Sequence, residues 1–245
     1  MITTYHRPQT LDEALALLSQ PNTFPLGGGT FLSHVQTETV SVVDLQSLGL
    51  NRIHKKGNNL EVGATVTLQQ LLESAHCPEA LKTAIKLEAP LNLRNSATVA
   101  GTLVTADGRS SFTASLLALD TKVEQIADGK SVVTHLGEFL PLRPRGLITQ
   151  IVIPIHGKFA FEYVSRTPSD KPIVCVALSQ WTSGRTRLVI GGWGKSPTLA
   201  MDGTESGGLE TAARNACHEA TDEWGSAAYR MDIAATLSKR CAQAV

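Results

Sequence analysis

The sequence predicts an α+β fold built from two small α/β units and a third unit of strands and helices. Three observations carry this prediction: two stretches in which strand and helix signals alternate, a Pro/Gly break, and three β-rich runs ahead of two helical runs. Pro154 and the pair His156-Gly157 mark the break. The expected units are a first domain of residues 1–155, with subdomains of about 1–55 and 56–155, and a second domain of residues 156–245.

The first unit begins with a helix over residues 10–18. Thr10 and Glu13 form a capping-box pattern, in which each side chain meets an unpaired backbone N–H at the helix start, and leucines follow at helical spacing. A short strand over residues 23–26 leads into the sequence LGGGT, and TVSVVDL (39–45) is a further strand. This order of elements is typical of a small parallel β-α-β unit.

The second unit repeats this arrangement with a different sequence. Thr67 and Gln70 form a second capping box, and a helix that starts near Pro78 ends before Pro90. Residues 90–112 show no regular period, so we expect an irregular segment there. The other expected elements are a strand over 59–67, a helix over 113–120, and strands over 121–126 and 147–155.

The third unit places its strands before its helices. We expect a Gly/Ser/Asp-rich loop from Gly191 to Gly208 between the two groups. The expected strands are 158–166, 173–181 and 186–193, and the expected helices are 208–220 and 226–240.

The composition excludes several classes of function. The chain has 245 residues, of which 42% are hydrophobic, and 22 Lys and Arg balance 22 Asp and Glu. A protein without excess positive charge lacks the main source of affinity for nucleic acid or for an anionic membrane surface. The first residues, MITTYHRPQTLDEA, lack the pattern of a signal peptide, and no apolar stretch approaches the roughly 18 residues of a membrane span. We therefore expect a cytoplasmic protein.

The four cysteines, Cys77, Cys175, Cys217 and Cys241, are widely separated and form no C-x-x-C pair. The chain therefore has no sequence signature of a zinc site or an iron–sulfur cluster of its own. We predict no metal ligands and no catalytic acid, base or nucleophile.

The turn Gly27-Gly28-Gly29, which follows a predicted strand, is the first candidate binding element. Glycines let backbone N–H groups approach an anion closely, so such turns bind phosphates. The alternative is a tight turn without a ligand, and the dinucleotide pattern G-x-G-x-x-G is absent because Leu32 replaces its third glycine. If the turn binds a phosphate, we expect a side chain at Gly28 to block the ligand's approach.

The second candidate is the segment LNLRNSATVAGTLVTADGRSSF (91–112). Its small residues leave backbone amides open, and Thr98 and Thr102 add hydroxyl groups that suit phosphate oxygens. The alternative is a polar surface loop, although long irregular loops in compact domains are uncommon unless they are functional.

Two other sequences only resemble known motifs. GGWGKSP (191–197) lacks the first glycine of a phosphate-binding P-loop, whose position is Val189. HEATD (218–222) lacks the second histidine of a zinc protease, whose position is Asp222.

In its order of motifs the sequence resembles the FAD-binding subunit of the molybdenum hydroxylases, the family of xanthine dehydrogenase and aerobic carbon monoxide dehydrogenase. RNSATVAGTL followed by LLALD is fairly specific, and the ordered set spans nearly the whole chain. The matching pieces are PLGGGTFL, LEVGATVTLQQLLE, RNSATVAGTL, LLALDTKVE, LITQIVIP, FEYVSR and SAAYRMDIAATLSKR.

The resemblance implies an FAD-binding domain of the p-cresol methylhydroxylase type made of two α/β subdomains, followed by a domain with a three-stranded antiparallel sheet and helices. FAD would lie extended between the two subdomains. The residues that the resemblance places at FAD are Pro25, Leu26, Gly27, Gly28, Gly29, Thr30, Phe31, Leu32, Thr98, Val99, Ala100, Gly101, Thr102, Ser111 and Ile148.

The chain departs from the family pattern at four positions. The family's second loop reads threonine, an aliphatic residue, Gly-Gly-Asn, whereas Ala100 here replaces the first glycine and Thr102 the asparagine. Ser111 replaces an aspartate that usually contacts FAD, and Glu162 stands where some members have a lysine.

The function implied by the resemblance is electron transfer. A [2Fe-2S] small subunit and a molybdenum-cofactor large subunit would be the partners, and FAD would pass electrons to an external acceptor. One alternative is a nucleotide-binding or assembly module of the same fold without flavin turnover, which the departures at Ala100, Thr102 and Ser111 motivate. The other is a flavin oxidoreductase that needs no partner.

Overall fold

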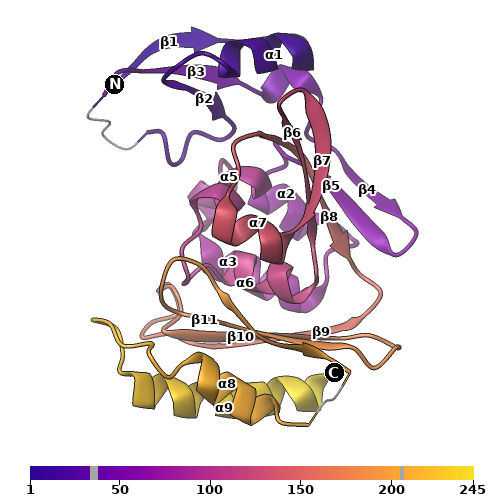
Figure 1. Ribbon diagram of the computed structural model, residues 1–245, viewed down its shortest axis with the longest axis vertical. Coiled ribbons are helices and arrows are strands. Elements are labelled where there is room, and N and C mark those ends of the chain that lie inside the picture. The colour runs from indigo at the N-terminus through magenta and orange to yellow at the C-terminus, as the bar shows by residue number, and fades with distance from the viewer. Residues whose placement is uncertain (34–37, 205–206) are drawn as a thin grey trace.

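The computed structural model describes residues 1–33, 38–204 and 207–245, and its strands form three sheets that follow one another along the long axis of the molecule (Figure 1). The N-terminal sheet contains β1 (Ile2–His6), β2 (Thr23–Leu26) and β3 (Val40–Asp44) in the order β1-β3-β2. Both strand pairs are parallel, and α1 (Leu11–Leu18) connects β1 to β2. The expected small parallel unit is therefore present, with β1 as a strand that the sequence did not predict.

The two predicted capping boxes differ in the structure. At α2 (Leu68–Glu73) the box is complete, because the Thr67 hydroxyl accepts the Gln70 N–H and the Gln70 side chain accepts the Thr67 N–H. At α1 the Thr10 hydroxyl accepts the Glu13 N–H at 3.2 Å, but the Glu13 carboxylate accepts from Gln9 instead of Thr10. Both helices still begin where the pattern predicts.

The central sheet is antiparallel throughout and has the order β4-β5-β8-β6-β7. Its edge strand β4 includes the exposed residues Lys55 and Lys56. The strands are β4 (Ile53–Lys56), β5 (Asn59–Gly63), β6 (Lys122–Ala127), β7 (Lys130–His135) and β8 (Leu147–Pro154). The short helix α7 (Leu136–Leu142) packs against β6 and β7, and the helix α3 (Glu79–Glu88) packs against α2 and α6 (Ser111–Ala118).

The segment 91–112, expected to be irregular, is mostly helical. It contains α4 (Leu91–Arg94) and α5 (Val99–Thr105) and the start of α6 (Ser111–Ala118). The Thr98 and Ser110 hydroxyls cap α5 and α6. Helix α6 corresponds to the helix expected over residues 113–120, and every one of its residues is buried, so it has no exposed face.

The C-terminal sheet has four antiparallel strands, β12-β11-β10-β9, instead of the expected three. The additional strand, β12 (Thr198–Gly203), lies within the segment 191–208 that was expected to be a loop. Residues 205 and 206 of that segment lie outside the described residues. This edge strand has no buried residue and therefore no alternating pattern. The other strands are β9 (Lys158–Val164), β10 (Val174–Gln180) and β11 (Thr186–Gly191).

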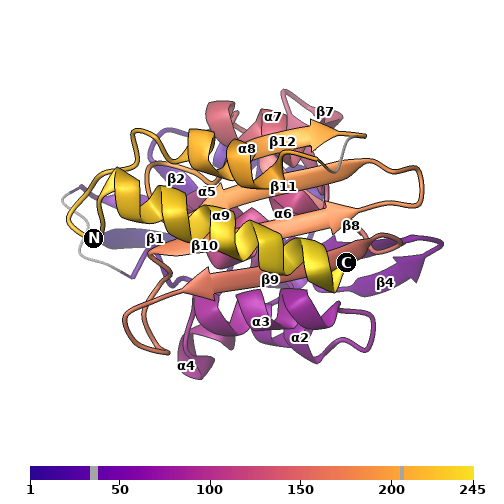
Figure 2. The same ribbon diagram turned by 90° about the horizontal axis from the view of Figure 1, so that it is seen from below.

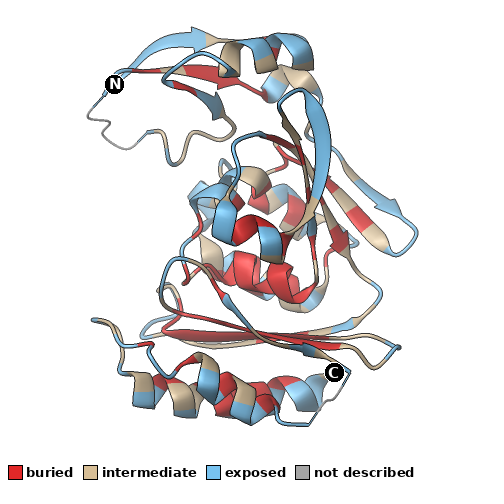
Figure 3. Cartoon of the chain, in the orientation of Figure 1, coloured by how far each residue is buried: buried red, intermediate tan, exposed pale blue. Residues whose placement is uncertain are grey.

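Helices cover both faces of the C-terminal sheet. Figure 2 shows α8 (Leu209–Ala216) and α9 (Ala227–Ala244) lying across one face, and α6 packs against β10 and β11 on the other. The face toward α6 contributes residues such as Cys175 and Val189 to the main hydrophobic core, so that core extends from the central unit into the C-terminal sheet (Figure 3). No helix among the described residues is long and apolar enough to cross a membrane.

The loop between α5 and α6 joins the central unit to the C-terminal sheet through its backbone. The Gly108 N–H donates to the Gly194 carbonyl at 2.9 Å, and the Gly192 N–H donates to the Gly108 carbonyl at 2.7 Å. A Cβ on Gly108 would lie 1.5 Å from the Trp193 carbonyl oxygen, so only glycine fits there. The sequence that resembles a P-loop thus forms part of an interface within the chain.

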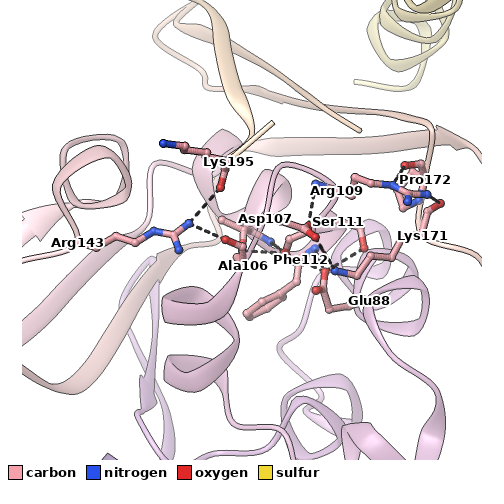
Figure 4. Close-up of polar contacts among 12 residues, drawn as sticks. Glu88, Ala106, Asp107, Arg109, Ser111, Phe112, Arg143, Lys171, Pro172 and Lys195 are labelled. Carbon is pink, nitrogen blue, oxygen red and sulfur yellow. Dashed lines mark hydrogen bonds and ion pairs between the residues drawn. The ribbon is translucent and has the colours of Figure 1, made fainter. Parts of the chain in front are cut away.

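Side chains strengthen the same interface (Figure 4). Arg109 donates to the Lys171 and Pro172 carbonyls at 2.7 and 3.1 Å, and Lys171 forms an ion pair with Asp107. On the other side, the Arg143 guanidinium donates to the Ala106 and Lys195 carbonyls. Arginine side chains thus bind backbone oxygens on both sides of the contact.

Asp120 is the centre of a further ionic contact between the two parts. It follows α6 with a φ of 57°, and its carboxylate accepts from Arg185 at 2.8 Å, from Arg187 and from His135. Burial alone raises the pKa of Asp120, but Arg187 and the hydrogen bonds from Arg185 and His135 bring that pKa below its usual value. The ionised carboxylate therefore stabilises the folded chain.

We expect Asp120→Asn to lower the free energy of unfolding by about 3 kcal/mol at neutral pH, because the buried Arg187 would lose its nearest anion and keep only Asp202, at 3.6 Å. Asparagine tolerates the positive φ, so the backbone is preserved. Because the folded-state pKa is lowered, the stabilisation exists at neutral pH and disappears as the pH falls through that pKa. Urea unfolding at several pH values should therefore show the two proteins converging in acid.

Asp232→Asn is the matched control, because Asp232 pairs with Arg214 on the surface and should contribute less than about 1 kcal/mol. Equal effects of the two substitutions would show that the Asp120 contact is not a major source of stability.

Candidate functional site

A cleft of about 350 Å³ separates the N-terminal sheet from the central unit. The residues that line it come from the strand ends and the glycine turn on one side, and from the starts of α2 and α5 on the other. They are Tyr5, Leu26, Gly27, Gly28, Gly29, Asp44 and Gln46 from the first side, and Thr65, Thr67, Asn95, Ser96 and Thr98 from the second. The two candidate segments predicted from the sequence therefore face the same cleft.

The glycine turn lies against the backbone of the second segment. A Cβ on Gly28 would lie 1.5 Å from the Ser96 carbonyl oxygen, and a Cβ on Gly27 would lie 2.7 Å from the Thr98 hydroxyl. The backbone N–H groups of Gly27, Gly28 and Gly29 donate to no other described residue. The turn thus combines a close contact between two loops with amides that remain available to a ligand.

The second segment is held rigidly by main-chain hydrogen bonds. Leu68 N–H donates to Ala97 at 2.9 Å, and Val99 N–H donates to Val66 at 2.9 Å, so the residues around Thr98 pair with the start of α2. The Thr98 hydroxyl accepts the Gly101 N–H at 3.2 Å. This wall of the cleft is therefore formed before any ligand binds.

The structure brings only part of the predicted site set to the cleft. Leu26, Gly27, Gly28, Gly29 and Thr98 line it. Eight other predicted residues are close to the cleft in sequence but do not line it. They are Pro25, Thr30, Phe31 and Leu32 beside the glycine turn, and Val99, Ala100, Gly101 and Thr102 in the first turn of α5.

Ser111 and Ile148 lie elsewhere. Ser111 is fully buried, and its hydroxyl donates to the Ala84 carbonyl at 2.8 Å and contacts Glu88. Glu88 also accepts the Phe112 N–H at the start of α6, and burial raises the pKa of this carboxyl (Figure 4). Ile148 is part of the main hydrophobic core. The resemblance to the family did not predict these structural contacts of Ser111 and Ile148.

The charges of the cleft are unusual for a phosphate site. Among the lining residues, Asp44 carries the one formal charge, and no Lys or Arg is present. Tyr5 donates its hydroxyl to Asp44, and that hydrogen bond raises the pKa of Tyr5. Sequence reasoning missed both residues, although Asp44 lies near the end of the strand predicted over residues 39–45. The carboxyl ends of parallel strands often form binding sites.

Thr65 offers a further unused polar group in the cleft. Its hydroxyl oxygen is buried and has no hydrogen-bond partner, although the residue lines the cleft. Rotation about the Cα–Cβ bond can bring a threonine hydroxyl to the position of its methyl group. With the three glycine amides, it gives a set of donors that fits an acceptor-rich group such as a diphosphate.

A larger cavity of about 610 Å³ lies between α7 and strands β11 and β12. Its polar residues, including Asp120, Arg185 and Asp202, already pair with one another. This cavity belongs to the ionic contact described above. No group of three or more His, Cys, Asp or Glu side chains among the described residues is arranged to hold a metal ion.

Comparison with known proteins identifies the family. A family model described as the FAD binding domain in molybdopterin dehydrogenase matches residues 1–156, more than half of the chain. The chain belongs to this family. Its cofactor is FAD, and it is an oxidoreductase subunit: the FAD-binding medium subunit of a molybdenum hydroxylase-type dehydrogenase.

Individual relatives cover more of the chain than the family model does. YgfM, an uncharacterized protein of Escherichia coli K12, is 26% identical over 246 residues, which cover 97% of this chain and 94% of YgfM. The carbon monoxide dehydrogenase medium chain of Afipia carboxidovorans is 27% identical over 201 residues, or 74% of this chain and 69% of that protein.

A solved structure extends the likeness to the whole fold. The reconstituted carbon monoxide dehydrogenase of Oligotropha carboxidovorans has a chain that superposes with a TM-score of 0.83 at 23% identity, covering 98% of this chain and 96% of that chain. The expected α+β fold is therefore confirmed, and the fourth C-terminal strand refines it.

We expect Gly28→Ala to destabilise the chain by about 2 kcal/mol, because its methyl group would overlap the Ser96 carbonyl and force the two loops apart. This effect differs from the one expected from the sequence, in which a side chain at Gly28 obstructs the ligand. Urea unfolding of the ligand-free protein measures it.

Gly203→Ala is the control, because a Cβ there meets no atom within 4 Å. If Gly28→Ala unfolds at the wild-type urea concentration, the close contact between the loops does not constrain the fold.

Proposed function

We propose that this chain transfers electrons from the iron–sulfur clusters of a partner chain, through FAD bound in the cleft, to an external acceptor. The family match carries the proposal, since residues 1–156 correspond to an FAD binding domain of molybdopterin dehydrogenases. FAD supplies the redox chemistry when it is bound, because it can exchange one or two electrons. The protein binds the cofactor, orients it and limits its contact with water.

In this proposal the cleft between the N-terminal sheet and the central unit receives the FAD diphosphate. The amides of Gly27, Gly28 and Gly29 and the Thr65 hydroxyl would donate to its oxygens, and the fixed Thr98 loop would form the opposite wall. The unpaired state of these groups in the structure supports this role. The units that clasp FAD would be residues 1–55 and 56–155, with residues 156–245 as a companion domain.

We further propose that the partners are a [2Fe-2S] small subunit and a molybdenum-cofactor large subunit in a cytoplasmic complex. The name "medium chain" of the Afipia carboxidovorans relative supports this composition. The cysteines of this chain also support a complex in which a partner holds the iron–sulfur clusters. All four are buried and unpaired, and burial raises the pKa of Cys77, Cys175 and Cys241 to about 12 and of Cys217 to about 11. They are poor cluster ligands, so the clusters would be held by another chain.

One observation favours the alternative of a nucleotide-binding or assembly module without flavin turnover. The cleft contains a carboxylate and no cation, so a diphosphate would gain no ion pair with the residues that line it.

Absorption spectroscopy distinguishes the two functions. Purified chain incubated with FAD and desalted should retain the two visible bands of oxidised flavin and lose them on anaerobic reduction. A colourless protein, or bound flavin that cannot be reduced, would favour the alternative. Purification from the source cells, followed by iron and molybdenum analysis, tests the partners.

We expect Thr65→Val to affect stability and FAD affinity in opposite directions. Replacing the unpaired hydroxyl with a methyl group should raise the free energy of unfolding of the ligand-free chain by about 1 kcal/mol. Loss of the donor should weaken FAD binding by about fivefold, measured by flavin fluorescence.

Thr121→Val is the matched control, because Thr121 also has a buried, unpaired hydroxyl but does not line the cleft. It should stabilise the chain without changing FAD affinity. Equal FAD affinity of both variants and wild type would exclude Thr65 as a cofactor contact.

A further inference from the structure

Asp44 is a buried carboxylate in the wall of the cleft. It is the last residue of β3, has an exposed fraction of 3%, and lines the cleft beside the glycine turn. One carboxylate oxygen accepts the Gln46 N–H at 2.9 Å, and the other accepts the Tyr5 hydroxyl. Arg7 Nε lies 3.7 Å from the second oxygen. These contacts fix the orientation of the carboxylate.

The fixed carboxylate still has capacity to accept. Each oxygen can accept two hydrogen bonds, and the structure supplies one donor to each within hydrogen-bond distance. An ionised carboxylate cannot donate, so its complement in a ligand is a donor such as a hydroxyl. A phosphate oxygen, which is itself an anionic acceptor, would be repelled at the same position.

The cleft thus presents two kinds of polar group side by side. Gly27, Gly28 and Gly29 present N–H donors, whereas Asp44 next to them presents acceptors. A sugar next to a diphosphate matches this arrangement, because the sugar offers hydroxyl donors and the diphosphate offers acceptors. In doubly wound nucleotide-binding sheets, an acidic residue near a glycine turn accepts a ribose hydroxyl in the same way.

We propose that Asp44 accepts a hydrogen bond from a sugar hydroxyl of FAD and thereby sets the direction in which the cofactor lies in the cleft. The hydroxyl belongs either to the ribose of the adenosine half or to the ribityl chain of the flavin half. Tyr5 acts through Asp44, as a positioning residue that holds the carboxylate. This assignment rests on the proposed binding of FAD in the cleft.

Calorimetric titration of the full chain with FAD, ADP and FMN tests the assignment. ADP contains the ribose without the ribityl chain, and FMN contains the ribityl chain without the ribose. Asp44→Asn keeps the shape of the side chain but removes its charge, and we expect it to weaken FAD binding by tenfold or more. An accompanying loss of ADP affinity identifies the ribose, and a loss of FMN affinity identifies the ribityl chain.

Asp12→Asn is the matched control, because Asp12 is an exposed carboxylate in α1 that does not line the cleft. The Asp12→Asn variant should bind FAD with the affinity of the wild type. Tyr5→Phe should weaken FAD binding by about threefold while thermal unfolding confirms a folded chain. If Asp44→Asn does not fold, wild-type chain still provides the test for the ribose, because 2′-deoxy-ADP or 3′-deoxy-ADP should bind about tenfold more weakly than ADP.

The outcomes separate this assignment from the proposed function. If wild type binds FAD and folded Asp44→Asn binds it equally or more tightly, Asp44 only repels the cofactor and the assignment is wrong while the proposed function stands. A folded wild-type chain that binds none of the three probes would overturn both.

Discussion

The close contact between the glycine turn and the Ser96 carbonyl is the constraint on which the binding cleft depends. The N-terminal sheet has a small core built around Ala14, Val43 and Leu45, to which Leu147 of the central strand β8 also contributes. Because Gly28 has no side chain, the backbones of the two units meet directly. This contact sets how closely the two units approach, while the turn's amides have no partner among the described residues.

The rest of the chain supports the opposite wall. Helix α6 is buried on all sides because α3 and the C-terminal sheet pack around it, so the C-terminal sheet is part of the environment of the central unit. Backbone hydrogen bonds at Gly108 and arginine side chains on both sides reinforce this packing. The position of Thr98 in the cleft therefore depends on residues more than 90 positions away in the sequence.

The sequence predicted elements with one buried and one exposed face and missed edge strands that lack this pattern. The helices near residues 10–18 and 226–240 have caps and apolar stripes, and both are present in the structure. The edge strand β12 has no buried residue, so it shows no periodic signal, whereas α6 was expected as a helix over residues 113–120 although every one of its residues is buried.

The candidate site was predictable to a similar extent. The glycine turn and the Thr98 segment are recognisable because their residue types are unusual, and the structure brings both to one cleft. Tyr5 and Asp44 are 39 positions apart and meet only because β1 and β3 pair in parallel, a register that no local pattern specifies. The Glu88 contact that occupies Ser111 likewise arises from tertiary packing.

The two walls of the cleft are held in place by different parts of the chain. The wall that contains Thr98 is continuous with α5, and the loop after α5 is hydrogen-bonded to the C-terminal sheet at Gly108. The N-terminal sheet has the smallest of the three cores, and that core includes Leu147 of β8, so apolar packing also joins this sheet to the central one. Widening the cleft would therefore require this shared core to open as well as the contact between Gly28 and Ser96.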